Sequence, residues 1–253
     1  MIDFYRFEKL GQYDKLLHAI TTKSLQSPFS FSMALHTGEE EKDISHNRED
    51  ISNLLSVNKE LHFIVAKQTH SSNIVIVKDR KTKGWKSLED AIENCDALIS
   101  DRKDVVLTIL TADCVPILLY DEKQEVVAAV HAGWKGTQSE IAFKTIQKMK
   151  KEFLSNPKDI LAGLAPSIGS CCYEVGEDVA RYFFDIPKSF DKIGEKYMLD
   201  LPYLNKKQLL NAGVLEQNIE MSELCTACNV DRFFSYRKEQ GCSGRFMSMI
   251  GLA

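Results

Sequence analysis

Short runs of apolar, mainly β-branched residues alternate with polar stretches through the first half of the chain. The runs at 62–66 and 73–77 are separated by KQTHSS, which predicts a strand, a tight connection and a second strand. Residues 104–110 are almost continuously apolar, which is typical of a strand buried on both faces. The runs at 115–120 and 126–130 are joined by a short polar loop and predict an antiparallel hairpin.

The second half of the pattern predicts helices mixed with strands. Thr137 followed by Glu140 predicts a capping box at a helix start. Apolar residues then recur at helical spacing until Asn156-Pro157, namely Ala142, Ile146, Met149 and Phe153. Strands are expected at 160–164, 233–236 and 245–250, and helices at 177–184 and about 204–212. The charged stretch Gly38–Asp50 is expected to end a loop and begin a helix through Leu55. Because no regular βαβ period appears, the predicted fold class is α+β with mixed sheets.

Composition narrows the function classes. The chain has 253 residues, 44% hydrophobic and 27% charged, with a net charge of −4. The chain lacks the excess of basic residues that would suggest nucleic acid as a partner, so an enzyme that acts on small molecules fits better. No apolar run reaches the length of a membrane span and the start lacks signal-peptide order, so we expect a cytoplasmic protein. No Pro/Gly/Ser linker divides the chain, so we expect one domain over residues 1–253. The seven cysteines, odd in number, indicate reduced thiols.

The predicted hairpin brings a thiol and an imidazole together. If Asp121 pairs with Val126, His131 faces Pro116, and Cys114 lies diagonally across on the same face. A register shift of one residue would separate the two side chains onto opposite faces. Three interpretations remain open here: a structural pair, a cysteine nucleophile with a histidine base, or a metal site.

His70 is the candidate third ligand of a metal site. It lies in Gln68-Thr69-His70-Ser71, at the tip of the first predicted strand pair, where small polar residues flank it. A cysteine and two histidines at strand ends suit zinc, and three protein ligands leave a fourth position for water or substrate. The remaining histidines lack this setting and are interpreted as surface or packing residues, namely His18, His36, His46 and His62.

Six blocks of sequence resemble the laccase-domain family, also called the polyphenol oxidase or multicopper polyphenol oxidase family. They are KQTHSSNIVIV, CDALIS, LTADCVPILLYD, AAVHAGWKGT, GLAPSIGSCCYEVG and CTACNVDRFFSYR, in this order. Members of the family are described as purine nucleoside phosphorylases, with adenosine deaminase and methylthioadenosine phosphorylase activity. The resemblance implies an α+β fold of layered mixed sheets, purine nucleosides and phosphate as substrates, and zinc on His70, Cys114 and His131.

The N-terminal part departs from the family pattern. Lys23 stands where the family usually has arginine, and Ala34 where it has asparagine. Lysine keeps the charge but loses the bidentate fork for phosphate. Lys23 and Gln68 are nonetheless candidate substrate-binding residues by this resemblance. Asn47-Arg48 fits the family's NR pair, with a structural contact beside a helix as its simplest role.

Further polar residues are candidates for the reaction itself. Asp113 is the nearest acid or base to the proposed ligands, although a turn-capping role is as plausible. The sequence after His131 enters a helix with two glycines and Lys135, a pattern compatible with phosphate. Near the C-terminus, Arg237 and Arg245 are candidate substrate contacts.

Cys225 and Cys228 form a CxxC pair. A structural zinc would need a second pair at similar spacing, which Cys171, Cys172 and Cys242 do not supply, so a structural or incidental role is expected.

Three other functions compete. A copper-dependent polyphenol oxidase is less favoured, because the chain has six histidines and no His-x-His pair. A cysteine hydrolase would use Cys114 and His131, and a non-catalytic binding protein would tolerate loss of the three ligands. We expect a monomer or weak homodimer with no nucleic-acid or membrane partner.

Overall fold

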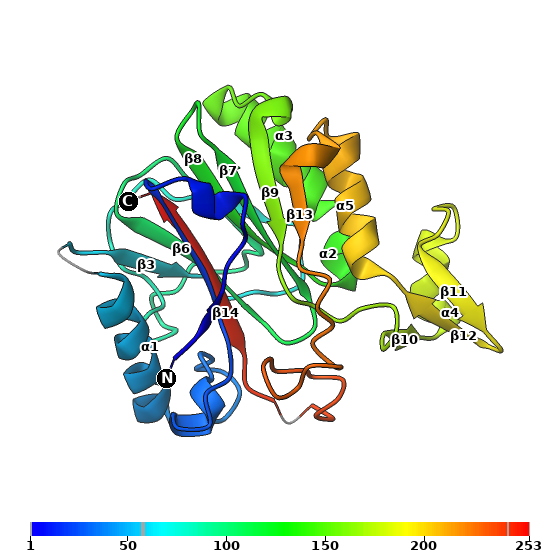
Figure 1. Ribbon diagram of the computed structural model, residues 1–253, viewed down its shortest axis with the longest axis horizontal. Coiled ribbons are helices and arrows are strands. Elements are labelled where there is room, and N and C mark those ends of the chain that lie inside the picture. Colours follow the sequence, from blue (N-terminus) through cyan, green and yellow to red (C-terminus); the bar gives the residue numbers. More distant parts are fainter. Residues whose placement is uncertain (1, 57–58, 242, 253) are drawn as a thin grey trace.

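Two β-sheets stacked face to face form the centre of the computed structural model (Figure 1), which describes residues 2–56, 59–241 and 243–252. The first sheet has the order β1-β2-β14-β6-β3. Its strands are β1 (Phe4–Tyr5), β2 (Leu16–Thr21), β14 (Phe246–Leu252), β6 (Val105–Thr111) and β3 (His62–Val65). The second has the order β13-β9-β7-β8-β5-β4. Its strands are β13 (Ile219–Met221), β9 (Ile160–Leu164), β7 (Val115–Asp121), β8 (Val126–Ala132), β5 (Ala97–Ser100) and β4 (Ile74–Ile76).

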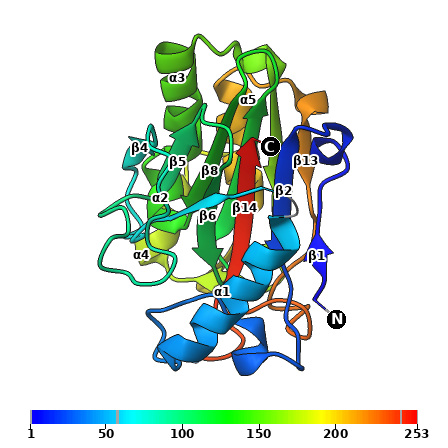
Figure 2. The ribbon, with the colours of Figure 1, turned by 90° about the vertical axis from the view of Figure 1, so that its left-hand side faces the viewer.

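Helices cover the outer faces of both sheets (Figure 2). Helix α1 (Glu41–Leu55) lies on the first sheet, and α3 (Ile141–Phe153) and α5 (Leu201–Asn211) lie on the second. The short helices are α2 (Trp134–Gln138) and α4 (Glu177–Ala180). Short 3-10 helices occupy Leu10–Gln12, Pro28–Phe31, Pro157–Asp159, Arg181–Phe183 and Glu216–Asn218. A small third sheet of β10 (Glu174–Val175), β12 (Lys196–Leu199) and β11 (Phe190–Ile193) projects to the right in Figure 1.

The central strands are apolar along their whole length because each is buried on both faces. In β7, Ile117 and Leu119 pack toward the helices, whereas Leu118 and Tyr120 pack toward the first sheet. All seven residues of β6 are buried as well, so the continuous apolar pattern indicated its position correctly. The predicted α+β class with layered mixed sheets is confirmed.

The hairpin register is the predicted one. Asp121 pairs with Val126, and Pro116 pairs with His131. The strand over 160–164 and the helix ending at Leu55 also lie where they were expected.

Two local predictions are wrong. Glu140 makes no capping hydrogen bond, and Thr137 lies inside α2, where its hydroxyl accepts a hydrogen bond from Asn205. The chain instead forms two helices, because α2 ends at Gln138 and α3, which carries the apolar residues, begins at Ile141 after Glu140 in a left-handed backbone conformation. Residues 233–236 form no strand, since they lie in a loop held by the hydrogen bond from the Ser235 N–H to Glu239.

The two strands flanking KQTHSS do not pair with each other. Strand β3 pairs with β6 in the first sheet, and β4 pairs with β5 in the second. The connection between them therefore crosses from one sheet to the other. No helix within the described residues is long and apolar enough to cross a bilayer.

Candidate metal centre and adjoining cavity

The β7–β8 hairpin positions two of the three candidate ligands. His131 is near the end of β8, and Cys114 directly precedes β7 on the neighbouring strand. Because His131 faces Pro116, Cys114 is its diagonal neighbour on the same face. The thiol and the imidazole thus meet at the open end of the hairpin.

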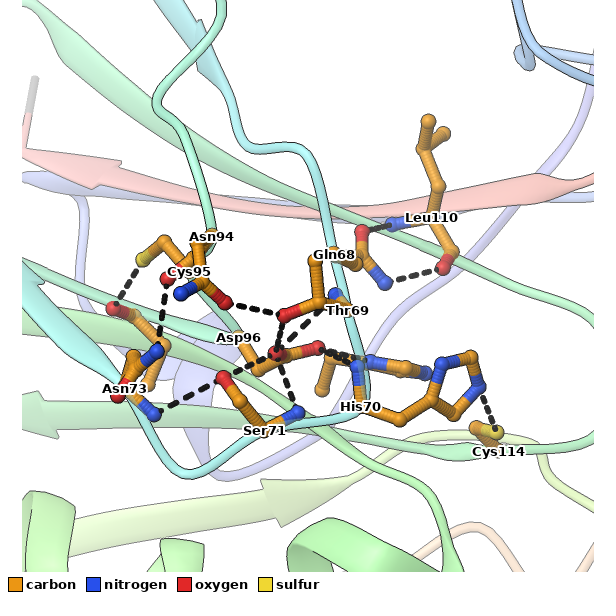
Figure 3. A network of polar contacts seen from close by, with 12 residues as sticks. Gln68, Thr69, His70, Ser71, Asn73, Asn94, Cys95, Asp96, Leu110 and Cys114 are labelled. Atoms are coloured by element: carbon orange, nitrogen blue, oxygen red, sulfur yellow. Dashed lines mark hydrogen bonds and ion pairs between the residues drawn. The ribbon is translucent and has the colours of Figure 1, made fainter.

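His70 reaches the same point from the connection between the two sheets. Its Nε2 lies 3.9 Å from Cys114 Sγ (Figure 3), and its ring centroid lies 4.8 Å from that of His131. The donor atoms of the three residues all lie within 4.8 Å of one another. His70, Cys114 and His131 can therefore bind one metal ion.

The buried carboxylate of Asp96 holds two of these ligands in place. Its Oδ1 lies 2.8 Å from His131 Nδ1 and accepts a hydrogen bond from the His70 backbone N–H at 3.0 Å. Its Oδ2 accepts from both the backbone and the hydroxyl of Ser71 at 2.7 Å (Figure 3). The contact between Asp96 Oδ1 and His131 Nδ1 leaves the other ring nitrogen of His131, Nε2, to bind a metal, as in many metal-ligating histidines.

Sequence reasoning missed Asp96. The available signal was a carboxylate directly before the apolar run of β5, whose partner strand carries His131.

Gly133 makes room for the ligands. A Cβ at this position would lie 2.9 Å from His70 Cδ2 and 3.0 Å from Cys114 Sγ, closer than side chains normally pack. The glycine after the His131 strand is thus required by the close approach of two ligands.

The ligand side chains shift one another's proton affinity. Burial would raise the pKa of Cys114, but the adjacent imidazole of His131 outweighs it and lowers the pKa to about 6. Burial would lower the pKa of His131, but the Cys114 thiolate and Asp96 raise it to about 9. Without metal, the pair therefore favours a thiolate beside an imidazolium.

The three ligands open onto a cavity of about 720 Å³. This volume suits a small organic ligand. The residues that line the cavity include three aromatic residues and two arginines, namely Trp134, Tyr173, Tyr236, Arg237 and Arg245. His36, which the sequence pattern placed among the surface or packing histidines, also lines the cavity.

The two arginines hydrogen-bond to neutral groups. Arg237 donates to the Glu174 carbonyl, and Arg245 donates to the carbonyls of Ser243 and Gly244. Burial lowers the pKa of Arg245, and nearby negative groups, Cys114 first, offset only part of this effect.

A family model described as multi-copper polyphenol oxidoreductase laccase matches residues 18–253. The chain belongs to this family. It is 34% identical over 248 residues to purine nucleoside phosphorylase YlmD of Bacillus subtilis, covering 94% of this chain and 89% of that protein. It is 40% identical over 190 residues to a purine nucleoside phosphorylase of Clostridium acetobutylicum, covering 73% and 74% of the two chains.

The fold is also similar to that of a solved structure. The crystal structure of YlmD from Geobacillus stearothermophilus matches with a TM-score of 0.91 and 30% identity, covering 97% of this chain and 94% of that one. The resemblance to the laccase-domain family is therefore confirmed in both sequence and fold.

The side chain of Asp113 holds together two segments that border the cavity. Its backbone adopts φ 87°. Its carboxylate accepts hydrogen bonds from the hydroxyl of Thr226 and from the backbone N–H of Arg237, both at 2.6 Å. It thereby joins the segment before β7 to the loop that carries Arg237. Such a strained backbone next to a cavity is common at functional sites.

The other candidate substrate residues are placed differently. Gln68 lines the cavity, but its amide exchanges two 2.8 Å hydrogen bonds with the Leu110 backbone. Lys23 is held by Glu239 and by the Val230 carbonyl, outside the residues that line the cavity. Lys135 is exposed beside the ring of Trp134 and does not line the cavity either.

Proposed function

We propose that the protein is a zinc-dependent purine nucleoside phosphorylase, which converts a purine nucleoside and phosphate into a free base and ribose 1-phosphate. The observation that carries the proposal is a metal-binding triple opening onto a cavity that has both aromatic and cationic walls. The names of the relatives from Bacillus subtilis and Clostridium acetobutylicum support the same reaction class.

The cavity offers matched surfaces for the two substrates. Trp134, Tyr173 and Tyr236 supply aromatic side chains with which a purine can pack. Arg237 and Arg245 present positive charge for phosphate, because both guanidinium groups contact neutral partners. Asp113 fixes the backbone of Arg237 and so positions the phosphate contact.

The residues of the triple fit zinc. Zinc is a borderline-soft ion that binds imidazole nitrogen and thiolate sulfur, and three protein ligands are typical of a catalytic zinc site with an open position. When bound, zinc supplies Lewis-acid polarisation and lowers the pKa of a bound water. Asp96 orients His131, and the connection between the two sheets presents His70. Copper is the less favoured ion.

The same centre supports hydrolytic deamination of adenosine as a second activity, since that reaction needs an activated water rather than phosphate. Phosphorolysis of methylthioadenosine would use the phosphorylase chemistry unchanged.

A cysteine hydrolase is the alternative that one observation favours. Cys114, His131 and Asp96 are arranged as a nucleophile, a base and an orienting carboxylate. His70 discriminates between the two functions, because a metal site needs it as a ligand whereas a hydrolase does not.

The test is an assay of the purified protein with inosine and with adenosine, each with and without phosphate, together with measurement of zinc and copper. We expect zinc at the triple and phosphate-dependent release of base. Ammonia release from adenosine without phosphate would establish the deaminase activity. No turnover of either nucleoside, together with an amidase or esterase activity that survives His70→Ala, would replace the proposal with the hydrolase.

A further inference from the structure

Four cysteines from two distant segments meet at a second place in the molecule. Cys171 and Cys172 follow β9, and Cys225 and Cys228 follow β13. The four sulfur atoms all lie within 4.8 Å of one another, and none of them belongs to the triple of His70, Cys114 and His131. Cys228 Sγ lies 3.4 Å from Cys172 Sγ and 3.7 Å from Cys171 Sγ.

The sheet explains why the two segments meet. Strands β9 and β13 are parallel neighbours, with Leu164 paired to Met221 (Figure 1). The two segments that follow these strands therefore leave the sheet at the same end. Beyond the strands, the Ser167 N–H donates to the Leu224 carbonyl and the Thr226 N–H donates to the Ser167 carbonyl. The backbone itself therefore brings the CC pair and the CxxC pair together.

The spacing of the sulfurs matches a tetrahedral thiolate site. Zinc–sulfur bonds of about 2.3 Å place the four sulfurs of such a site about 3.8 Å apart. The spacing is too wide for bonded sulfurs, and all four thiols are free.

Backbone groups around the sulfurs also suit thiolates. The Gly169 N–H donates to Cys225 Sγ at 3.3 Å, a contact that stabilises negative charge on sulfur.

We propose that Cys171, Cys172, Cys225 and Cys228 form a second metal site, a closed structural centre for one zinc ion. Four protein ligands leave no position for substrate, so its role is to join two loops. One loop leads into Tyr173 and the other contains Thr226, which holds Asp113. The ion would thus stabilise two loops that support the cavity lining without taking part in the reaction there.

The first test counts zinc in the folded protein after purification under reducing conditions. We expect two zinc ions per chain in the wild type and one in Cys171→Ser, whose side chain is exposed and tolerates the change. Cys114→Ser should also retain one ion, because it removes only the other centre. Cys95→Ala removes a buried thiol outside both clusters and should keep two ions, which controls for the loss of a thiol as such.

The second test uses cobalt as a spectroscopic probe. Zinc is removed, Co²⁺ is added to Cys114→Ser, and the expected result is strong thiolate-to-cobalt absorption of a tetrahedral four-sulfur site. The same spectrum should vanish in the double variant Cys114→Ser/Cys171→Ser, with the fold checked by circular dichroism. If Cys114→Ser does not fold, the same comparison is made in His70→Ala.

Two results would overturn the second site. One is a wild-type protein with a single zinc ion and no cobalt–thiolate absorption outside the Cys114 centre. The other is mass spectrometry that finds a disulfide between Cys228 and either Cys171 or Cys172 in protein alkylated directly on cell lysis. Neither result would bear on the proposed phosphorylase reaction, which is assayed separately.

Discussion

At the scale of single residues, one buried carboxylate contacts both histidines of the candidate metal centre. Asp96 meets His131 through its ring Nδ1 and His70 through its backbone N–H. Hydrogen bonds from groups around Asp96 and the nearby His131 outweigh the effect of burial and hold the pKa of this carboxyl well below its usual range. The carboxylate is therefore ionised wherever the protein is folded near neutral pH.

Replacing Asp96 by Asn should weaken metal binding without removing a ligand. The amide keeps the size of the side chain but loses the charge that orients His131, so zinc affinity should fall about 10- to 100-fold. Competition with a chelator of known affinity measures it. Asp101→Asn, on the same chain segment but paired with Arg102 at the surface, should leave the affinity unchanged. Equal affinity in the two variants would contradict the role given to Asp96.

The thiol of Cys114 should titrate at unusually low pH in the metal-free protein. Its pKa is lowered to about 6, so the reactive thiolate is present above that pH and is lost as the pH falls through it. Alkylation by iodoacetamide at each pH, located by mass spectrometry, should show this midpoint. His131→Gln should move it upward, whereas Cys95, whose pKa burial raises to about 11, should stay unreactive. A wild-type midpoint near pH 8.5 would refute the assignment.

At the scale of elements, a buried cation holds helix α1 to two loop segments that precede β3 and follow it in the chain. Arg48 donates to the carbonyls of Met33, Gly84 and Trp85, and its burial lowers its pKa to about 10. The family pair Asn47-Arg48 thus has the structural role expected from the sequence. Its charge is satisfied by carbonyl oxygens rather than by a carboxylate.

Arg48→Met should destabilise the fold while leaving the metal centre intact. The change leaves three buried carbonyl groups without their hydrogen-bond donor. We therefore expect the free energy of unfolding to fall by about 3 kcal/mol. Urea unfolding measures the loss, and metal content of the folded variant is measured alongside. Glu49→Ala, an exposed neighbour on the same helix, should cost less than about 0.5 kcal/mol. A similar cost for both variants would show that Arg48 contributes little.

At the scale of the whole molecule, the cavity is assembled from segments far apart in the chain. His36, His70, Asp113, Tyr173 and Arg245 all line it. No short piece of sequence contains the site, so substrate contacts depend on how the two sheets and the C-terminal loop come together.

Arg245→Gln should raise the KM for phosphate about 10- to 100-fold while zinc content stays unchanged. The reason is that the variant removes a half-buried positive charge from the residues that line the cavity and changes no metal ligand. Phosphate dependence of base release measures the change. Arg232→Gln, an exposed arginine of the same C-terminal region, is the matched control. An unchanged KM for phosphate would place the anion site elsewhere.

Local pattern alone determined much of this protein. Continuous apolar runs located β6 and β9, and the polar loop after Asp121 set a hairpin register that puts Cys114 and His131 on one face. These predictions succeed because strand alternation and tight loops involve residues that are neighbours in the chain. The sequence motifs likewise sufficed to recognise the family.

Only the tertiary structure decided which distant groups meet. It assigned β3 and β4 to different sheets, brought Asp96 to both histidines, and held Lys23 against Glu239 instead of the cavity. It also joined the CC and CxxC pairs through the parallel pairing of β9 with β13. Such contacts are set by the pairing and stacking of whole sheets, which no periodicity within a single segment encodes.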